Sequence, residues 1–478
     1  MPHDARRSSA RVAAIAAALA LLGTTAWADP PARVGRVAWT AGDVTLAPQA
    51  GAAASNAALN WPVTTGNVLV TGPSGRAEVT IGATAFDLDV GTEVDVEQLD
   101  DDQMRLRVVH GSVALRTRDR QDAAMLALQS PLGRFTLAQP GSLRVDVRND
   151  GVHGTAWHGR VEFVAGDGSR YSFAPGQHAR LSASPGGAVA MNLLDVGNDD
   201  FKHFVQARAG GHPAAATSHY VSPAMTGAEG LDAYGRWESS ADGAIWVPDV
   251  PANWAPYRYG RWAWVEPWGW TWVDDAPWGF APFHYGRWTL WGDRWAWVPG
   301  TYVARPVYAP AMVAWTGAPP PAPSVSASVT IGIGATVGWV PLAPREVYVP
   351  PYAVSATYIR QVNITHVTNV TEIQNVTRVV TAGRQRGAVP QPPVRPLAFA
   401  GNPRAATTVQ AQVLQTQQPV VARLAAAAPH EPAVPHEPRP AHPHPPAHEG
   451  QPPHEARHGQ AHEPGREHRH RREGEEER

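Results

Sequence analysis

Three copies of the tetrapeptide Tyr-Gly-Arg-Trp supply the side chains of this sequence that are best suited to binding. The guanidinium of the arginine can form two parallel hydrogen bonds with a carboxylate or phosphate group, and it can also stack on the phenol ring of the tyrosine. Three uses of these side chains stay open: packing within the fold, binding of a glycan or anionic polymer, and contact with a protein partner. The residues that would contact a ligand are Tyr234, Arg236, Tyr259, Arg261, Tyr285 and Arg287.

A second aromatic cluster follows each copy of the tetrapeptide, and turn residues lie between the tetrapeptide and this cluster. The turns are Asp242-Gly243, Glu266-Pro267-Trp268-Gly269 and Gly292-Asp293, so each repeat is predicted to be a β-hairpin. Strand alternation puts the tyrosine and arginine on one face and the tryptophans on the other, while the glycine leaves room for a neighbouring ring. The tryptophan face is expected to form a shared core made of Trp237, Trp246, Trp262, Trp264, Trp270, Trp272, Trp288, Trp295 and Trp297.

Other chemistry is sparse in this sequence. Metalloprotease, nucleophile-elbow, phosphate-loop and dinucleotide motifs are all absent, so we expect a protein that is not an enzyme and has no cofactor. Acidic residues such as Asp87 and Asp89 alternate with apolar ones, which favours a solvated strand face over a calcium site. The C-terminal histidines can chelate a transition metal or have no specific role; the candidate ligands are His442, His444, His468 and His470.

The composition of the N-terminal segment indicates the cellular location of the protein. Three arginines precede an apolar run over residues 12–22, which ends near Ala26-Trp27-Ala28, so residues 1–28 are predicted to be a signal peptide, with an uncleaved anchor as the alternative. No later segment is apolar over the length of a membrane span. We therefore expect an exported protein, periplasmic or at the cell surface or extracellular. The chain has no cysteine, and its near-neutral charge gives no sign of nucleic-acid binding.

Residues 33–195 are predicted to be a β-domain. Short apolar alternations, as in Phe86 to Val90 and Leu143 to Val147, lie between glycine or proline turns. An all-β sandwich, barrel or β-helix fits this pattern equally well.

The same segment resembles the FecR domain of bacterial envelope proteins. The resemblance rests on Gly35-Arg36-Val37 with Gly42-Asp43-Val44, on Thr65 to Thr71 leading to Ser74 to Val79, and on a series of later glycine motifs. These include Gly111-Ser112-Val113, Ser130 to Gly133, Gly141 with Leu143-Arg144-Val145, Gly159-Arg160-Val161 and Pro175-Gly176-Gln177. It implies an envelope β-domain and does not carry over the signalling role of FecR proteins in iron transport.

The rest of the chain divides by composition. A linker covers residues 196–230, with short helical content near Phe201 to Arg208, and the tryptophan-rich repeats cover 231–300. Residues 301–383 are expected to be a proline-rich connector with extended β segments, including the Asn-x-Thr hexad that starts at Asn363, and residues 384–478 a disordered Pro/His/Glu/Arg-rich tail. The repeats and the apolar patch near Trp339 are similar to a region of unknown function that follows FecR domains in exported proteins.

Taken together, the sequence predicts a non-enzymatic binding or scaffolding protein of the envelope. Two alternatives stay open: a periplasmic sensory or regulatory component that acts through the FecR-like domain, and a module that binds cell-wall glycan. An envelope protein is the other candidate partner, and the oligomeric state is not predicted.

Overall fold

The computed structural model describes residues 29–210, 216–323, 335–367, 369–385 and 397–424. Strands predominate over helices in these residues, which confirms the predicted all-β class. The two largest hydrophobic cores organise these residues. One lies within the β-domain of residues 33–195, and the other lies in an aromatic-rich part, residues 217–424, that we call the aromatic module. The predicted signal peptide, residues 1–28, lies outside the described residues.

The β-domain is a sandwich of two layers that share one long strand. Sheet A pairs β4, β1, β6, β7, β9, β12, β13, β16 and β17 in that order, and sheet B pairs β3, β2, β5, β8, β9, β10, β11, β14 and β15. The strands of sheet A are β1 (Gly35–Ala41), β4 (Pro62–Val63), β6 (Arg76–Ile81), β7 (Thr84–Leu88), β12 (Gly141–Arg148), β13 (Gly151–His158), β16 (Gln177–Ala183) and β17 (Val189–Leu194). Those of sheet B are β2 (Val44–Ala47), β3 (Ser55–Asn56), β5 (Val68–Thr71), β8 (Glu93–Leu99), β10 (Leu126–Ser130), β11 (Gly133–Leu137), β14 (Val161–Ala165) and β15 (Arg170–Phe173).

The shared strand β9 (Met104–Thr117) passes from one layer to the other. Its first half pairs with β8 in sheet B and its second half with β12 in sheet A. Gly111 lies at the crossing with φ +87°, a conformation that side chains with a Cβ rarely adopt. The alternating apolar residues on both sides of it, such as Leu106 and Leu115, all face the core between the layers. One glycine therefore lets a single strand close the sandwich.

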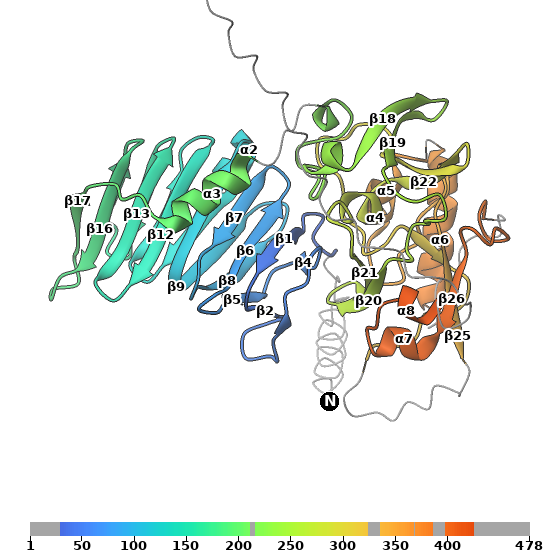
Figure 1. The fold of residues 1–478 in the computed structure, drawn as a ribbon, viewed down its shortest axis with the longest axis horizontal. Coiled ribbons are helices and arrows are strands. Elements are labelled where there is room, and N and C mark those ends of the chain that lie inside the picture. The colour runs from blue at the N-terminus through green and yellow to red at the C-terminus, as the bar shows by residue number, and fades with distance from the viewer. Residues whose placement is uncertain (1–28, 211–215, 324–334, 368, 386–396, 425–478) are drawn as a thin grey trace, which may run out of the picture. The chain divides into compact units, whose positions relative to one another are not determined.

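Helix α3 (Asp200–Gly210) covers the outer face of sheet A (Figure 1). Its Phe204 packs on Trp39 of β1, with ring centroids 5.2 Å apart, and its Arg208 Nε donates to Glu78 at 2.7 Å. Beneath it lies Asp87, which is fully buried, with its second oxygen 3.4 Å from the Arg116 guanidinium. Burial raises the pKa of Asp87 to about 7, and the nearby Arg116 opposes that shift. The prediction that this acidic strand face is solvated is therefore wrong at Asp87, because α3 covers it.

The tryptophan-rich repeats form three antiparallel hairpins. Each pairs tryptophans directly across its two strands: Trp237 with Trp246, Trp262 with Trp272, and Trp288 with Trp297. The first and third hairpins join through Trp246 and Trp297 into one four-stranded sheet, while the second stands alone. The strands are β18 (Gly235–Ser240), β19 (Gly243–Pro248), β20 (Gly260–Val265), β21 (Gly269–Asp274), β22 (Arg287–Trp291) and β23 (Arg294–Val298).

In every repeat the tetrapeptide glycine lies beneath the indole of the opposite strand. A Cβ on Gly235 would lie 2.7 Å from the Trp246 ring, and one on Gly260 would lie 2.8 Å from the Trp272 ring. Gly286 has the same relation to Trp297, whose ring lies nearer still, and it also takes φ +69°. Real Cβ atoms do not approach other heavy atoms so closely. The repeat therefore keeps its glycine because the cross-strand ring and a backbone carbonyl oxygen of the same strand together occupy the space of a side chain.

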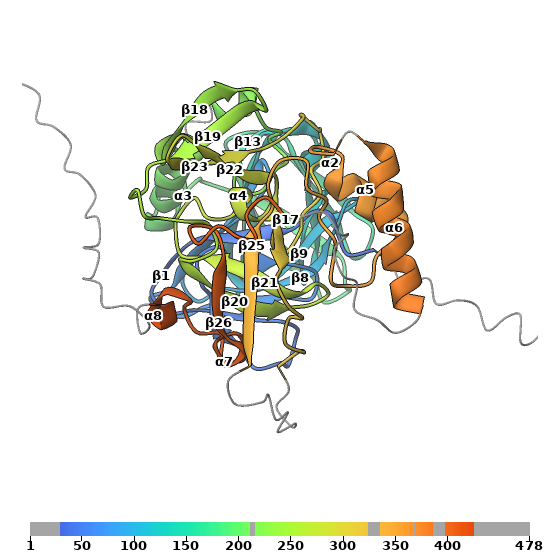
Figure 2. The ribbon, with the colours of Figure 1, turned by 90° about the vertical axis from the view of Figure 1, so that its right-hand side faces the viewer.

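Further elements complete the aromatic module. Three-stranded pairing links β24, β25 and β26, and α5 and α6 lie side by side at one edge of the module (Figure 2). The remaining elements are α2 (Arg120–Met125) in the β-domain and, in the module, the short 3-10 turns Thr217–His219 and Leu231–Ala233, α4 (Ala281–His284), β24 (Val313–Trp315), β25 (Thr336–Pro341), α5 (Ala356–Asn363), α6 (Val370–Gln385), β26 (Thr407–Gln410), α7 (Ala411–Gln415) and α8 (Val421–Leu424).

The Asn-x-Thr hexad folds as helix and turn, so the predicted extended strand there is wrong. Ile359 and Val362 on α5 pack in the cores together with Ile373 and Val376 of α6, and the spacing of three residues within each pair is helical. Asn369 accepts hydrogen bonds from the amides of Thr371 and Glu372, as a residue before a helix does. Burial at helical spacing outweighs the strand preference of the β-branched residues.

Two predicted boundaries also change. The linker of residues 196–230 contributes Val221 and Met225 to the aromatic core, so it is part of the module at its end. The boundary of the disordered tail at residue 384 is too early, because β26 pairs with β25, and Phe399 and Val420 are buried in the same core. Composition could not show this, since a short apolar segment is stabilised by surfaces distant in sequence.

We predict that Gly260→Ala destabilises the protein by about 1–3 kcal/mol, because the added methyl group must displace the Trp272 ring or the strand. The control is Gly230→Ala in the same module, where a Cβ meets nothing within 4 Å and φ is −101°. Denaturant unfolding monitored by tryptophan fluorescence measures both. Equal unfolding free energies for the two variants would contradict the role given to the glycine.

The buried Asp87 makes stability depend on pH. Its pKa is higher in the folded protein, so between pH about 4 and 7 the folded state binds more protons than the unfolded state, and stability falls as pH rises through this window. We compare the unfolding free energy of Asp87→Asn with that of the wild type at two pH values. We predict that the difference, variant minus wild type, is about 2 kcal/mol larger at pH 8 than at pH 5. Asp43→Asn, at an exposed position, controls for the loss of one charge. A difference that is the same at both pH values would refute the prediction.

Candidate functional site

The six tyrosine and arginine side chains predicted to bind a ligand do not form one open stripe. Tyr234 is 39% exposed, and Arg236 is exposed and paired with Glu238 at 2.7 Å. Tyr259 and Arg261 in the second repeat are partly buried. The third repeat differs most, because Tyr285 and Arg287 are buried in the core. Only the first repeat therefore offers both of its side chains to solvent.

Arg287 is the clearest departure from the expected surface role. Its guanidinium donates to the carbonyl oxygens of Glu346 and Gly286, at 3.0 and 2.8 Å, and to Asn363 Oδ1 at 2.9 Å. Burial lowers its pKa to about 10, and the nearby Tyr257 opposes the shift. Arg287 thus connects the third hairpin to α5 and to the loop before it, and it cannot contact a ligand in this structure.

In the second hairpin, the face opposite the tryptophans is partly covered by other parts of the fold, the β-domain among them. In the second hairpin Arg261 is paired with Val273, which is fully buried. Asn60 of the β-domain donates to the carbonyl oxygens of Asp274 and Ala276, at 3.0 and 2.7 Å. Strand alternation separates the two faces of a hairpin, but it does not show what each face meets.

The nine tryptophans predicted to form a core have two kinds of environment. Trp237 and Trp264 are partly exposed. The other seven are buried: Trp246, Trp262, Trp270, Trp272, Trp288, Trp295 and Trp297. Several indole N–H groups are held by the fold, as in the hydrogen bond from Trp297 Nε1 to the Tyr285 carbonyl oxygen at 2.9 Å. The rings are therefore packing elements, and a stacking ligand would not reach most of them.

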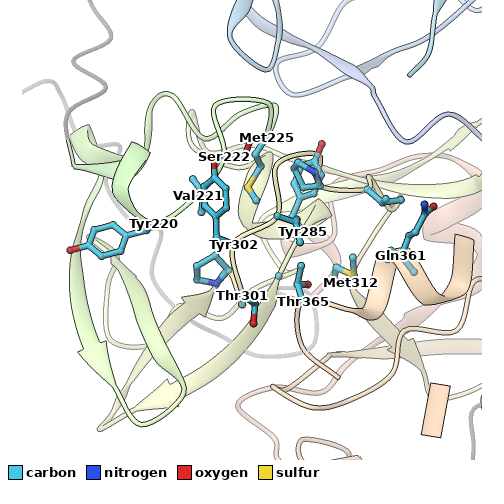
Figure 3. Close-up of a pocket in the computed structure, with 17 residues that line it drawn as sticks. Tyr220, Val221, Ser222, Met225, Tyr285, Thr301, Tyr302, Met312, Gln361 and Thr365 are labelled. Carbon is cyan, nitrogen blue, oxygen red and sulfur yellow. The ribbon is translucent and has the colours of Figure 1, made fainter. Parts of the chain in front are cut away.

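A shallow groove on the module surface has exposed aromatic rings at its border (Figure 3). Tyr302 is 56% exposed, and Tyr220 is stacked on Trp237 with ring centroids 4.4 Å apart. Figure 3 shows Tyr220 and Gln361 at opposite ends of the groove, with Tyr302 and Thr365 between them. We call this hollow the tyrosine groove.

The tyrosine groove combines flat rings with hydrogen-bonding side chains. The Trp237 indole under Tyr220 is itself fixed, because its Nε1 donates to Thr217 Oγ1 at 3.1 Å. Thr301 and Gln361 are exposed beside the rings and have hydroxyl and amide groups. Sequence reasoning missed Tyr220 and Tyr302, because they lie outside the repeats and no pattern marks them.

The histidines predicted to bind a metal all belong to the C-terminal segment. His442, His444, His468 and His470 lie outside the described residues. Among the residues that the structure does describe, no three histidine or acidic side chains gather as a metal site would require. In the same residues, no helix is both long and apolar enough to cross a membrane.

Comparison with known proteins adds one match. Residues 228–346 match the model of a family of unknown function, DUF6600. The matched segment holds all three hairpins and β24 and β25, whereas α5, β26 and the β-domain lie beyond it. No curated protein matches the chain.

We predict that Arg287→Ala destabilises the protein by about 3 kcal/mol, because the buried carbonyl oxygen of Gly286 and the partly buried one of Glu346 lose their donor and the core is left with a cavity. Arg236→Ala removes the equivalent, exposed arginine of the first repeat and should change stability by no more than about 0.5 kcal/mol. Denaturant unfolding of both variants measures the contrast. Similar losses would mean that the two arginines have the same role.

Proposed function

We propose that this chain is a non-enzymatic binding or scaffolding protein of the bacterial envelope that contacts its ligand through the tyrosine groove. The observation that supports this most is the pair of exposed rings, Tyr220 and Tyr302, beside hydroxyl and amide groups. Aromatic faces next to hydrogen-bonding groups suit the alternating apolar and hydroxyl surfaces of a sugar ring. A cell-wall glycan is therefore the ligand class that fits the groove best.

The packing of the aromatic module supports the scaffolding side of this proposal, because a closely packed core can hold the groove in a fixed geometry. Its rings interlock closely, as in Trp262 and Trp315 with centroids 4.5 Å apart. The groove is built from stretches of chain that are distant in sequence, among them those near Tyr220, Tyr302 and Gln361. A site assembled in this way keeps its geometry because the core beneath it is rigid. Little ordering is then needed when a ligand binds.

The envelope setting rests on the sequence. It follows from the signal-peptide pattern of residues 1–28 and from the FecR resemblance of residues 33–195. Several glycines that carry the resemblance take positive φ at turns, among them Gly42, Gly159 and Gly176. This geometry supports a structural reason for the motif and leaves the signalling alternative, a sensory component that acts through the β-domain, as a separate proposal.

Retention on insoluble peptidoglycan tests the proposed ligand class. We predict that the purified protein is retained and that Tyr302→Ala lowers retention at least fivefold, because the most exposed ring of the groove is lost. Tyr234→Ala is the matched control, since Tyr234 is also exposed but lies outside the groove. Retention of the control should equal that of the wild type.

Two results would count against the proposal. Failure of the wild type to be retained on peptidoglycan or on other envelope polysaccharides would refute glycan binding. A loss for Tyr234→Ala with none for Tyr302→Ala would place the contact on the first repeat instead of in the groove.

A further inference from the structure

A second hollow lies between the β-domain and the start of the aromatic module. It is larger than the tyrosine groove and is lined mostly by different chemical groups. Its volume is about 310 Å³, at the lower end of the range of roughly 300–1,000 Å³ found for small-molecule sites. One wall comes from β6, β7 and the end of β9, and the other from residues 217–229. We call it the interlayer cavity.

The register of sheet A explains why there is space here. Ala85 on β7 pairs with Thr80 on one side and with Arg116 on the other. Phe86 and Leu115, the next residues along, face the core of the sandwich, so Ala85 and Arg116 must face outward. Because Ala85 is small and lies at the centre of this outward-facing row, it leaves a hollow that residues 217–229 of the module do not fill.

The module side of the interlayer cavity is mostly apolar. Val221, Pro223, Met225 and Ala228 line it, and a hydrogen bond from the Gly82 amide to Thr226 Oγ1, at 3.0 Å, holds this segment against the sheet. Such a wall favours a hydrocarbon or ring surface over a strongly hydrated ligand.

Most charges around the cavity already have partners. Arg116 pairs with Glu78, Glu229 accepts from Arg36 and Thr80 at 2.9 Å each, and Asp119 accepts from the first amides of α2. Arg118 is different. It is exposed at the rim, and among the described residues its guanidinium has neither a hydrogen bond nor an ion pair.

We propose that the interlayer cavity binds a small amphipathic anion, with its apolar body against Val221 and Met225 and its single carboxylate on Arg118. The guanidinium supplies two parallel N–H donors that match a carboxylate, and the apolar wall supplies the burial. This site does not depend on the tyrosine groove, although Val221 and Met225 line both hollows. The test therefore leaves these two residues unchanged.

Sodium octanoate is the probe, with 1-octanol and octyltrimethylammonium as neutral and cationic controls of equal chain length. Titration calorimetry on the full chain should show saturable octanoate binding at least tenfold tighter than that of either control. Arg118→Gln should weaken octanoate at least tenfold and leave octanol unchanged. Arg134→Gln, an exposed arginine on β11 of sheet B, is the matched control and should bind as the wild type does.

Filling the cavity provides the second arm. Ala85→Phe places a ring in the hollow without changing the core face of β7 and should abolish binding of octanoate and octanol alike. If that variant fails to fold, Ala83→Leu at the turn before β7 serves the same purpose, because Ala83 also lines the cavity. Absence of saturable octanoate binding, equal affinity for octanol, or equal effects of Arg118→Gln and Arg134→Gln would each overturn the proposal.

Discussion

The packing of an indole ring over a glycine backbone is the interaction on which the aromatic module depends. It recurs in all three repeats, and in each case the ring comes from the strand opposite the tetrapeptide. The indole of Trp297 is also tied by its N–H to the carbonyl oxygen of Tyr285, the first residue of its own repeat. One residue without a side chain thus lets two strands and a large ring pack as closely as a protein interior requires.

Because this unit is local, the three copies can be used in different ways. The first and third hairpins share a sheet through Trp246 and Trp297, whereas the second packs separately with Trp315 and Trp339. The tyrosine and arginine of the tetrapeptide consequently have a different environment in each copy. They are exposed in the first repeat, partly buried in the second and buried in the core in the third. Repetition in the sequence therefore preserves the hairpin and not the surface that it presents.

This contrast shows how far the sequence alone could lead. Turn residues and strand alternation predicted the hairpins, the cross-strand tryptophan pairs and the space above Gly260, since all of these are set within some fifteen neighbouring residues. They could not predict that Asn363 and the Glu346 carbonyl would enclose Arg287, or that β26 would pair with β25. These contacts join segments that are distant in sequence, and the same is true of the tyrosine groove. The helix α6 was missed because β-branched residues hid a helical burial pattern.

Hydrogen exchange of the indole N–H groups, followed by NMR, tests most directly whether the repeat tryptophans are a packed core. Trp297 and Trp272, whose Nε1 atoms donate to buried acceptors, should exchange only when the whole module unfolds. Trp291, which is 40% exposed, should exchange much faster. Fast exchange at Trp297 and Trp272 under native conditions would contradict the account, because it would mean that these rings open to solvent while the protein remains folded.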